Sequence, residues 1–145
     1  MKKNKKVTSR IEKLCAEKGV KFTHQRRIIA EVISNSDDHP DANEVYLRAN
    51  KIDTRISLAT VYRTIKLFEE HNVLNRIELG GKRARYEELN EDEHHDHLID
   101  IDSGEIIEFV NEEIENLQMK VAEKLGYQLV DHRMELFGKK IIKKD

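Results

Sequence analysis

Hydrophobic residues recur at helical spacing in four segments of the first half of the chain, which span residues 9–19, 23–35, 41–50 and 57–72. Thr23 stands where its side chain can cap the second segment. Asp41 and Glu44 have the spacing of a capping box at the start of the third. The pattern therefore predicts four short helices before residue 73.

The helix expected over residues 57–72 has two different faces. Its core-facing stripe consists of Leu58, Val61, Ile65 and Phe68. The opposite strip carries a small residue, a phenol and two cations, which are Ala59, Tyr62, Arg63 and Lys66. A strip of this kind fits the major groove of DNA. Each cation taken alone, however, is more often an ordinary solvated residue.

Two segments in which apolar and polar residues alternate follow, and they flank the Gly-Gly pair at residues 80–81. Lys82, Arg83 and Arg85 stand at or just beyond this expected turn. Helices followed by a hairpin with a basic tip are typical of a winged helix-turn-helix.

The second half of the chain has a different order of elements. After a polar connector, the pattern predicts strands at residues 94–101 and 105–110, a helix at 111–126 and a strand at 127–137. The helix has an apolar stripe made of Ile114, Leu117, Val121 and Leu125. About fifty residues bury little core alone, so we expect this half to pair with a second copy.

The fold class expected from these elements is α+β, with an N-terminal winged helix-turn-helix followed by a small α/β domain. We expect a DNA-binding domain at residues 1–88, a hinge at 89–93, and a dimerisation and metal-binding domain at 94–145. Charge supports the division, because residues 1–86 carry 19 Lys and Arg against 11 Asp and Glu, whereas residues 87–145 carry 7 against 17. The basic half is the candidate for a polyanionic partner.

Cysteine content and hydropathy exclude several classes of protein. The only cysteine, Cys15, excludes an intrachain disulfide and a cysteine-rich zinc site. No apolar run approaches the length of a membrane span, and the basic N-terminus lacks the apolar core of a signal peptide. We therefore expect a cytoplasmic protein with no membrane association.

Three histidines and six carboxylates lie within residues 93–109. Side chains alternate across a strand, so His95 and His97 would share one face while His94 and Asp96 share the other. Two half-sites result, and Glu108 and His132 are candidate partners from the neighbouring strands. Imidazole and carboxylate without thiolate suit Fe(II), Mn(II) or Zn(II). The HExxH motif of zinc hydrolases is absent. Taken alone, His132 fits a hydrogen-bonded core histidine as well as it fits a metal ligand.

The order and spacing of six motifs resemble the ferric uptake regulator family of metal-dependent bacterial repressors over about residues 8–138. The motifs are T-x-x-R at 23–26, HPDANEVY at 39–46, SLATVYRT at 57–64, HHDHLI at 94–99, GEIIEF at 104–109 and the DH at 131–132. The resemblance implies a winged helix, a dimerisation domain and a regulatory metal site at the hinge. It also implies that the protein is a homodimeric repressor of genes for metal homeostasis, above all iron, with a double-stranded DNA operator as partner and no small-molecule substrate.

The resemblance assigns the hinge site to His39, Glu87, His95, His97 and Glu108. Glu87 is preferred because it directly follows the aromatic Tyr86, as in the family pattern, whereas counting back from His97 without a gap gives Glu88 as the alternative. A second site resembles His94, Asp96, Glu115 and His132. We expect base or groove contacts from Tyr62 and Arg63 with Thr60 in support. Phosphate contacts are expected from Lys21, Arg26, Lys82 and Arg83, and Thr23 and Ser57 complete the expected DNA-binding set.

One departure from the family pattern concerns structural zinc. Many members carry a Cys-x-x-Cys pair where this chain has Asp100 and Ser103, so no cysteine-based zinc is expected. Iron, manganese and zinc all remain possible activators. Two other classes also remain open: a metalloenzyme that uses His95, His97 and Glu108, and a metal store or structural dimer. Neither explains the strip of Tyr62, Arg63 and Lys66.

Overall fold

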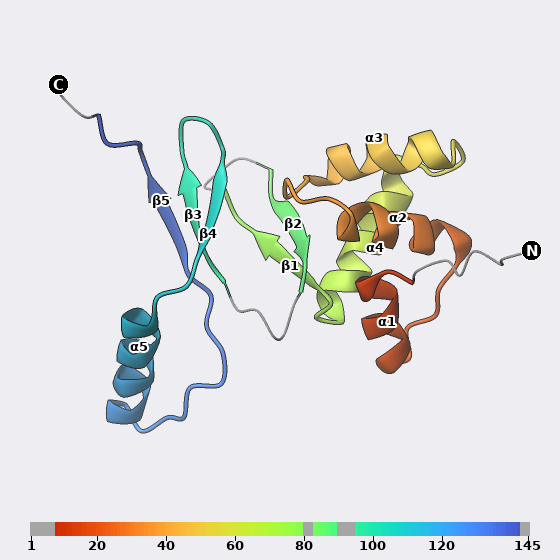
Figure 1. Cartoon of the computed structure of the whole chain (residues 1–145). Coiled ribbons are helices and arrows are strands. Elements are labelled where there is room, and N and C mark those ends of the chain that lie inside the picture. Colours follow the sequence, from red (N-terminus) through yellow and green to blue (C-terminus); the bar gives the residue numbers. More distant parts are fainter. Residues whose placement is uncertain (1–7, 80–82, 90–94, 143–145) are drawn as a thin grey trace, which may run out of the picture. The chain divides into compact units, whose positions relative to one another are not determined.

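The computed structural model of the chain describes residues 8–79, 83–89 and 95–142. The chain divides into two compact units, Met1–Asn90 and Glu91–Asp145 (Figure 1). Among the described residues, the first unit contains four helices and a hairpin, and the second contains three strands and a helix. These elements make up an α+β fold. None of the described helices is long and apolar enough to span a membrane.

The helices of the first unit are α1 (Arg10–Glu17), α2 (His24–Ser34), α3 (Ala42–Ile52) and α4 (Leu58–Glu70). A side-chain oxygen caps the first turn of each helix, and the capping residues are Ser9, Thr23, Asp41 and Ser57. The capping box predicted for Asp41 and Glu44 is confirmed. These local hydrogen bonds fix where each helix begins.

The core of the first unit is formed by the apolar stripes of the four helices. On α4 the prediction is confirmed for Val61, Ile65 and Phe68, which are buried. It is wrong for Leu58, which is 39% exposed because it is the first residue of the helix and lies at the edge of the core. Thr64 is buried on this face instead.

The hairpin pairs β1 (Leu74–Ile77) with β2 (Arg85–Glu88) in antiparallel register. Gly80, Gly81 and Lys82 lie outside the described residues. Tyr86 is buried in the core of the unit. Because neighbours on a strand point to opposite faces, Glu87 projects away from that core.

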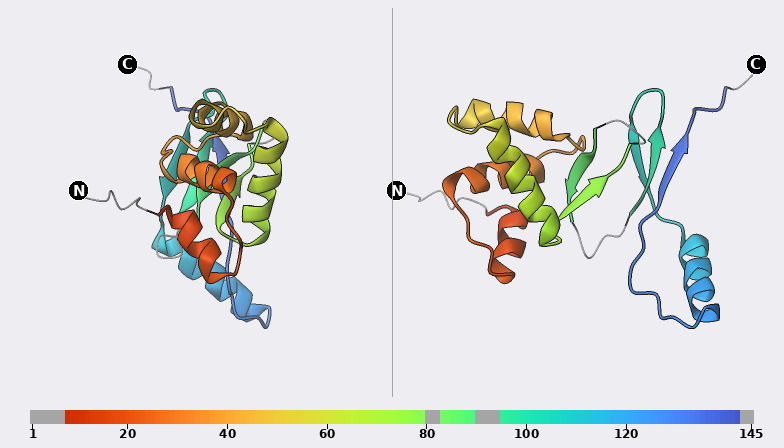
Figure 2. Two further views of the ribbon diagram at one scale, coloured as in Figure 1. Left: turned by 90° about the vertical axis from the view of Figure 1, so that its right-hand side faces the viewer. Right: turned by 180° about the vertical axis from the view of Figure 1, so that it is seen from behind.

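The sheet of the second unit has the order β4-β3-β5. The central strand, β3 (Asp96–Asp100), is antiparallel to β4 (Ile106–Phe109) and parallel to β5 (Glu135–Gly138). Asn111 caps α5 (Glu112–Lys124) as predicted. The views in Figures 1 and 2 agree that α5 lies beyond one end of the sheet rather than across its face.

Two expectations for the second unit need correction. The strand predicted from residue 127 begins only at Glu135, because β3 offers a pairing edge to residues 135–138 alone, and Val130 is 95% exposed. The predicted helical stripe exists, but Leu117, Val121 and Leu125 are 62%, 49% and 71% exposed. This stripe is therefore no part of the core formed by the described residues.

A turn at Asp100 closes the hairpin of β3 and β4. The Asp100 carboxylate accepts hydrogen bonds from the backbone N–H groups of Asp102 at 2.9 Å and Ser103 at 3.3 Å. These bonds lower the pKa of Asp100 below its ordinary value. An Asx-type turn thus includes Asp100 and Ser103, the two positions at which this chain departs from the Cys-x-x-Cys pattern of the resemblance noted above.

We expect the stabilising effect of this turn to depend on pH. The pKa of Asp100 is lower in the folded chain than its ordinary value of 3.8. The ionised carboxylate therefore stabilises the fold fully above about pH 4, and this contribution is lost as pH falls through the folded-state pKa. Urea unfolding of the natural chain and of Asp100→Asn should give a difference in unfolding free energy that is constant near neutrality and shrinks in acid. A difference that is unchanged in acid would contradict the assignment.

Candidate functional site

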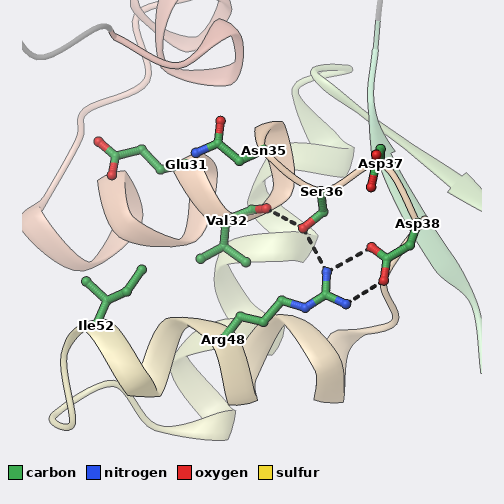
Figure 3. A pocket seen from close by; sticks show the side chains of 8 residues that line it. All are labelled: Glu31, Val32, Asn35, Ser36, Asp37, Asp38, Arg48 and Ile52. Carbon is green, nitrogen blue, oxygen red and sulfur yellow. Dashed lines mark hydrogen bonds and ion pairs between the residues drawn. The ribbon is translucent and has the colours of Figure 1, made fainter.

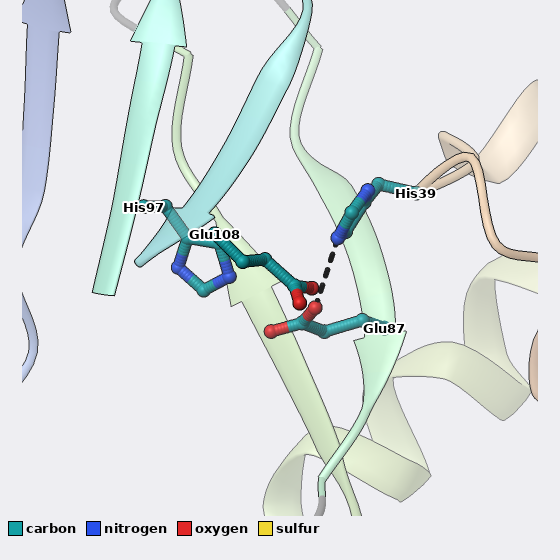
Figure 4. Close-up of side chains that lie close together, drawn as sticks. All are labelled: His39, Glu87, His97 and Glu108. Carbon is teal, nitrogen blue, oxygen red and sulfur yellow. Dashed lines mark hydrogen bonds and ion pairs between the residues drawn. The ribbon is translucent and has the colours of Figure 1, made fainter. Parts of the chain in front are cut away.

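His39 and Glu87 form a close pair in the first unit. His39 lies between α2 and α3 with φ of +52°, a left-handed conformation that few residues other than glycine adopt. Its Nε2 atom is 3.0 Å from Glu87 Oε2 (Figure 4). Asn75 Nδ2 donates to Glu87 Oε1 at 3.0 Å. His39 and Asn75 thus contact different oxygens of Glu87, and Glu87, not Glu88, faces His39.

An ion pair anchors the loop that carries His39. Arg48 of α3 donates from Nη1 and Nη2 to the two oxygens of Asp38, at 2.9 Å and 2.5 Å, and from Nη1 to Ser36 Oγ at 2.8 Å (Figure 3). The Arg48 guanidinium lowers the pKa of Asp38. These groups line a pocket of about 520 Å³ beside α2 and α3. Because Asp38 directly precedes His39, the bidentate pair stabilises the strained loop.

The second unit collects imidazoles and a carboxylate on one face of its sheet. His97 is buried in β3 and lies directly opposite Glu108 of β4 in the strand register (Figure 4). His95 Nε2 lies 3.9 Å from Glu108 Oε2. The structure therefore brings together all three members of the hinge-site set that belong to this unit.

The other face of β3 carries a second cluster. Asp96 is 1% exposed, and its Oδ1 is 3.2 Å from Nε2 of His132, which precedes β5. One ligand atom each from Asp96, Glu115 of α5 and His132 lie within 4.8 Å of one another. Burial of a carboxylate is costly unless it is paired or bound to a cation. Three of the four residues assigned to the second site thus meet, while His94 lies outside the described residues.

The expected DNA-contacting residues all belong to the first unit. Tyr62, Arg63 and Lys66 are exposed on α4. The Thr60 hydroxyl lies 2.9 Å from Ser57 Oγ and 3.4 Å from Arg63 Nη2, so it links the cap of α4 to the Arg63 side chain.

Two further residues of this set have structural roles. Thr23 caps α2, and Arg26 Nη1 donates to the Lys21 carbonyl at 2.7 Å. Arg83 is exposed just before β2, whereas Lys82 lies outside the described residues. The structure thus describes every member of the expected DNA-contacting set except Lys82.

A model of the ferric uptake regulator family matches residues 17–137 of the chain. The chain belongs to the ferric uptake regulator family. Members of this family are metal-responsive transcription regulators and not enzymes, so this chain is a regulator and the metalloenzyme alternative is set aside.

Individual relatives match over almost their whole length. The ferric uptake regulation protein of Rhizobium leguminosarum bv. viciae is 49% identical over 139 residues, which are 96% of this chain and 97% of that protein. A solved structure of a zinc-bound manganese uptake regulator is 49% identical, with a TM-score of 0.69 and coverage of 90% of this chain and 98% of its own. The Helicobacter pylori ferric uptake regulator, described as having three functional metal binding sites, is 30% identical, with a TM-score of 0.78 and coverage of 97% and 95%.

Sequence reasoning missed the residues that orient the clusters. Asn75 and Arg48 contact Glu87 and Asp38 through side chains that are distant in sequence, and neither belongs to a motif. The register of β1 with β2 places Asn75 opposite Glu87, so a predicted hairpin register was the one signal available for it. This chain cannot hold a structural zinc ion between pairs of cysteines, because Cys15 is its only cysteine.

We expect His132→Ala to remove one cation-dependent step of stabilisation. A cation present at 100 times its dissociation constant stabilises the state that binds it by about 2.7 kcal/mol per site. Urea unfolding with and without Zn(II) should therefore show a smaller increment for His132→Ala than for the natural chain. His24→Ala is the matched control. The His24 side chain is exposed, and its ion pair with Asp53 is long, at 3.9 Å between Nε2 and Oδ2. Equal increments for the two variants would show that His132 holds no cation.

Proposed function

We propose that this regulator is a homodimeric DNA-binding repressor that Fe(II) or Mn(II) activates by fixing its two domains relative to each other. The domains we propose are residues 1–88 and 94–145, with a hinge at 89–93. The observation that carries the proposal is that each unit holds part of one histidine and carboxylate set. His39 and Glu87 belong to the unit that displays Tyr62 and Arg63, and the remaining members belong to the other unit.

In this proposal one cation is ligated by His39, Glu87, His95, His97 and Glu108. Imidazole nitrogens and carboxylate oxygens suit Fe(II), Mn(II) and Zn(II) and include no thiolate. The pairing of His39 with Glu87 and of His97 with Glu108 supports this assignment, because ligands that are already gathered lose little freedom when the ion binds. A cation at 100 times its dissociation constant contributes about 2.7 kcal/mol, which shifts a hinge equilibrium about a hundredfold.

The proposed DNA-binding face consists of α4 and the wing, which is the hairpin of β1 and β2 with the residues that join them. Tyr62 and Arg63 would contact base edges in the major groove with Thr60 in support. Contacts to the DNA phosphates are proposed for Lys21, Arg26, Lys82 and Arg83, and Thr23 and Ser57 complete the proposed DNA-binding set. Because its proposed partner is DNA, we propose that the protein acts in the cytoplasm.

The second copy of the chain is proposed to cover the stripe on α5. Leu117, Val121 and Leu125 give this helix a contiguous exposed apolar face, which in a small domain marks an interface. Phe137 on β5 is also 49% exposed. The cluster of His94, Asp96, Glu115 and His132 is proposed to bind a second cation beside this interface and to stabilise the dimerisation domain.

Manganese is the second candidate for the activating ion. The manganese uptake regulator described above shares 49% identity with this chain, as does the ferric uptake regulation protein. Both ions accept the same histidine and carboxylate ligands. Titration of the protein with each ion under anaerobic conditions, followed by DNA binding, compares them directly.

We expect Glu87→Gln to weaken metal-dependent DNA binding at least tenfold, because it removes an anionic ligand while keeping the hydrogen bond that Asn75 donates. Fluorescence anisotropy measures the affinity for DNA. The duplex is one that the Mn(II)-loaded protein selects from a random library. Glu88→Gln is the matched control and should bind as the natural chain does. If the natural chain selected no sequence, or bound equally well in EDTA, the proposed function would be wrong. If Glu88→Gln showed the larger loss, the wing ligand would be Glu88.

Arg63→Ala should relax sequence preference. Loss of one bidentate base contact reduces discrimination by about 1–3 kcal/mol, whereas loss of a phosphate contact weakens binding to all duplexes equally. The ratio of affinities for selected and scrambled duplexes should therefore fall for Arg63→Ala. Lys66→Ala, one turn further along the same exposed strip, serves for comparison. A uniform loss in Arg63→Ala would identify a phosphate contact instead.

A further inference from the structure

Asn43, in the first turn of α3, connects two segments of the first unit that are far from it in sequence. The Tyr62 hydroxyl on α4 lies 3.5 Å from the side-chain amide of Asn43. The guanidinium of Arg83, in the wing, lies on the other side of the same amide. Asn43 thus contacts both the exposed helix and the wing.

The chemistry of its neighbours fixes the orientation of this amide. A guanidinium offers only N–H donors, so the amide oxygen of Asn43 faces Arg83. In this orientation it accepts hydrogen bonds from Arg83 Nη1 and, at 3.3 Å, from Nη2. The amide N–H groups then face the Tyr62 hydroxyl, which has lone pairs to accept them. One amide satisfies both partners with complementary groups.

The backbone around Asn43 is held firmly on both sides. The capping box of Asp41 and Glu44 fixes the first turn of α3. Asp41 and Arg85 form an antiparallel bridge, and Tyr86 N–H donates to the Pro40 carbonyl at 3.0 Å. Asn43 lies two residues after Asp41, and Arg83 lies two residues before Arg85, so this bridge brings the two segments together. The amide therefore extends from a rigid support.

We propose that Asn43 is a positioning residue for DNA recognition, which holds the Tyr62 phenol of the recognition helix and the Arg83 guanidinium of the wing in one arrangement before DNA binds. The inference rests on the proposed function. Long side chains that are already ordered lose less conformational entropy when they meet DNA. Asn43 itself need make no contact with DNA for this effect.

The test is a mutant cycle in the full-length, Mn(II)-loaded protein. Asn43→Ala is measured alone and in a background that carries Tyr62→Phe and Arg83→Ala, with a duplex selected by the natural protein from a random library and a scrambled duplex. Asn43→Ala alone should weaken binding to the selected duplex about tenfold. It should change binding less than twofold in the double-variant background, because its partners are already absent.

The salt dependence of binding separates positioning from general destabilisation. If Arg83 loses its support and its phosphate contact, the slope of log affinity against log salt should fall by about 0.9 in Asn43→Ala. Asn35→Ala is the matched control, since the Asn35 side chain is exposed and makes no hydrogen bond that is recorded among the described residues. Its affinity and slope should equal those of the natural chain. Asn43→Ser replaces Asn43→Ala if the latter lowers the melting temperature.

The remaining outcomes each overturn a different statement. A full effect of Asn43→Ala in the double-variant background would identify Asn43 as a direct DNA contact and not a positioning residue. Unchanged affinity and slope in the single variant would show that the amide has no role in binding. Failure of the natural protein to select any duplex would contradict the proposed function itself, which distinguishes that failure from a failure of this inference.

Discussion

Two adjacent polar residues of β3, Asp96 and His97, are both buried. A strand directs neighbouring side chains to opposite faces, so one ion or one partner cannot serve both. A buried charge or imidazole needs a counter-group, and each face supplies its own: His132 beside Asp96, and Glu108 opposite His97. The second unit is thereby committed to two separate polar clusters, and the ends of α5 and β4 are arranged around them.

The first unit meets a different requirement, which is to hold a strained ligand loop still. A left-handed φ at His39 persists only where surrounding contacts determine it. Those contacts are the Arg48 pair with Asp38 on one side and the hydrogen bond from Tyr86 to Pro40 on the other. They join the loop to α3 and to β2, the strand that carries Glu87. The histidine and its carboxylate are therefore positioned by the same hydrogen-bonded framework.

How far the sequence predicted this structure depended on the range of the interactions. Caps such as Thr23 and Asp41 act within three residues, so helix beginnings were predictable from the sequence alone. Strand alternation likewise separated His97 from Asp96. The start of β5 was not predictable, because it depends on which residues β3 can pair with. The short distance between Glu87 and His39 and the bridge made by Asn43 depend on contacts between residues more than ten positions apart.

The second unit has too few residues to bury a large core, and its helix directs an apolar stripe outward. Under the proposed function, a partner copy covers that stripe and cations occupy the clusters on β3. Both events require the folded unit and neither stabilises the unfolded chain. Each therefore raises the apparent affinity of the other through the folding equilibrium they share. Metal sensing and dimerisation are coupled in this way even where no ligand residue touches the dimer interface.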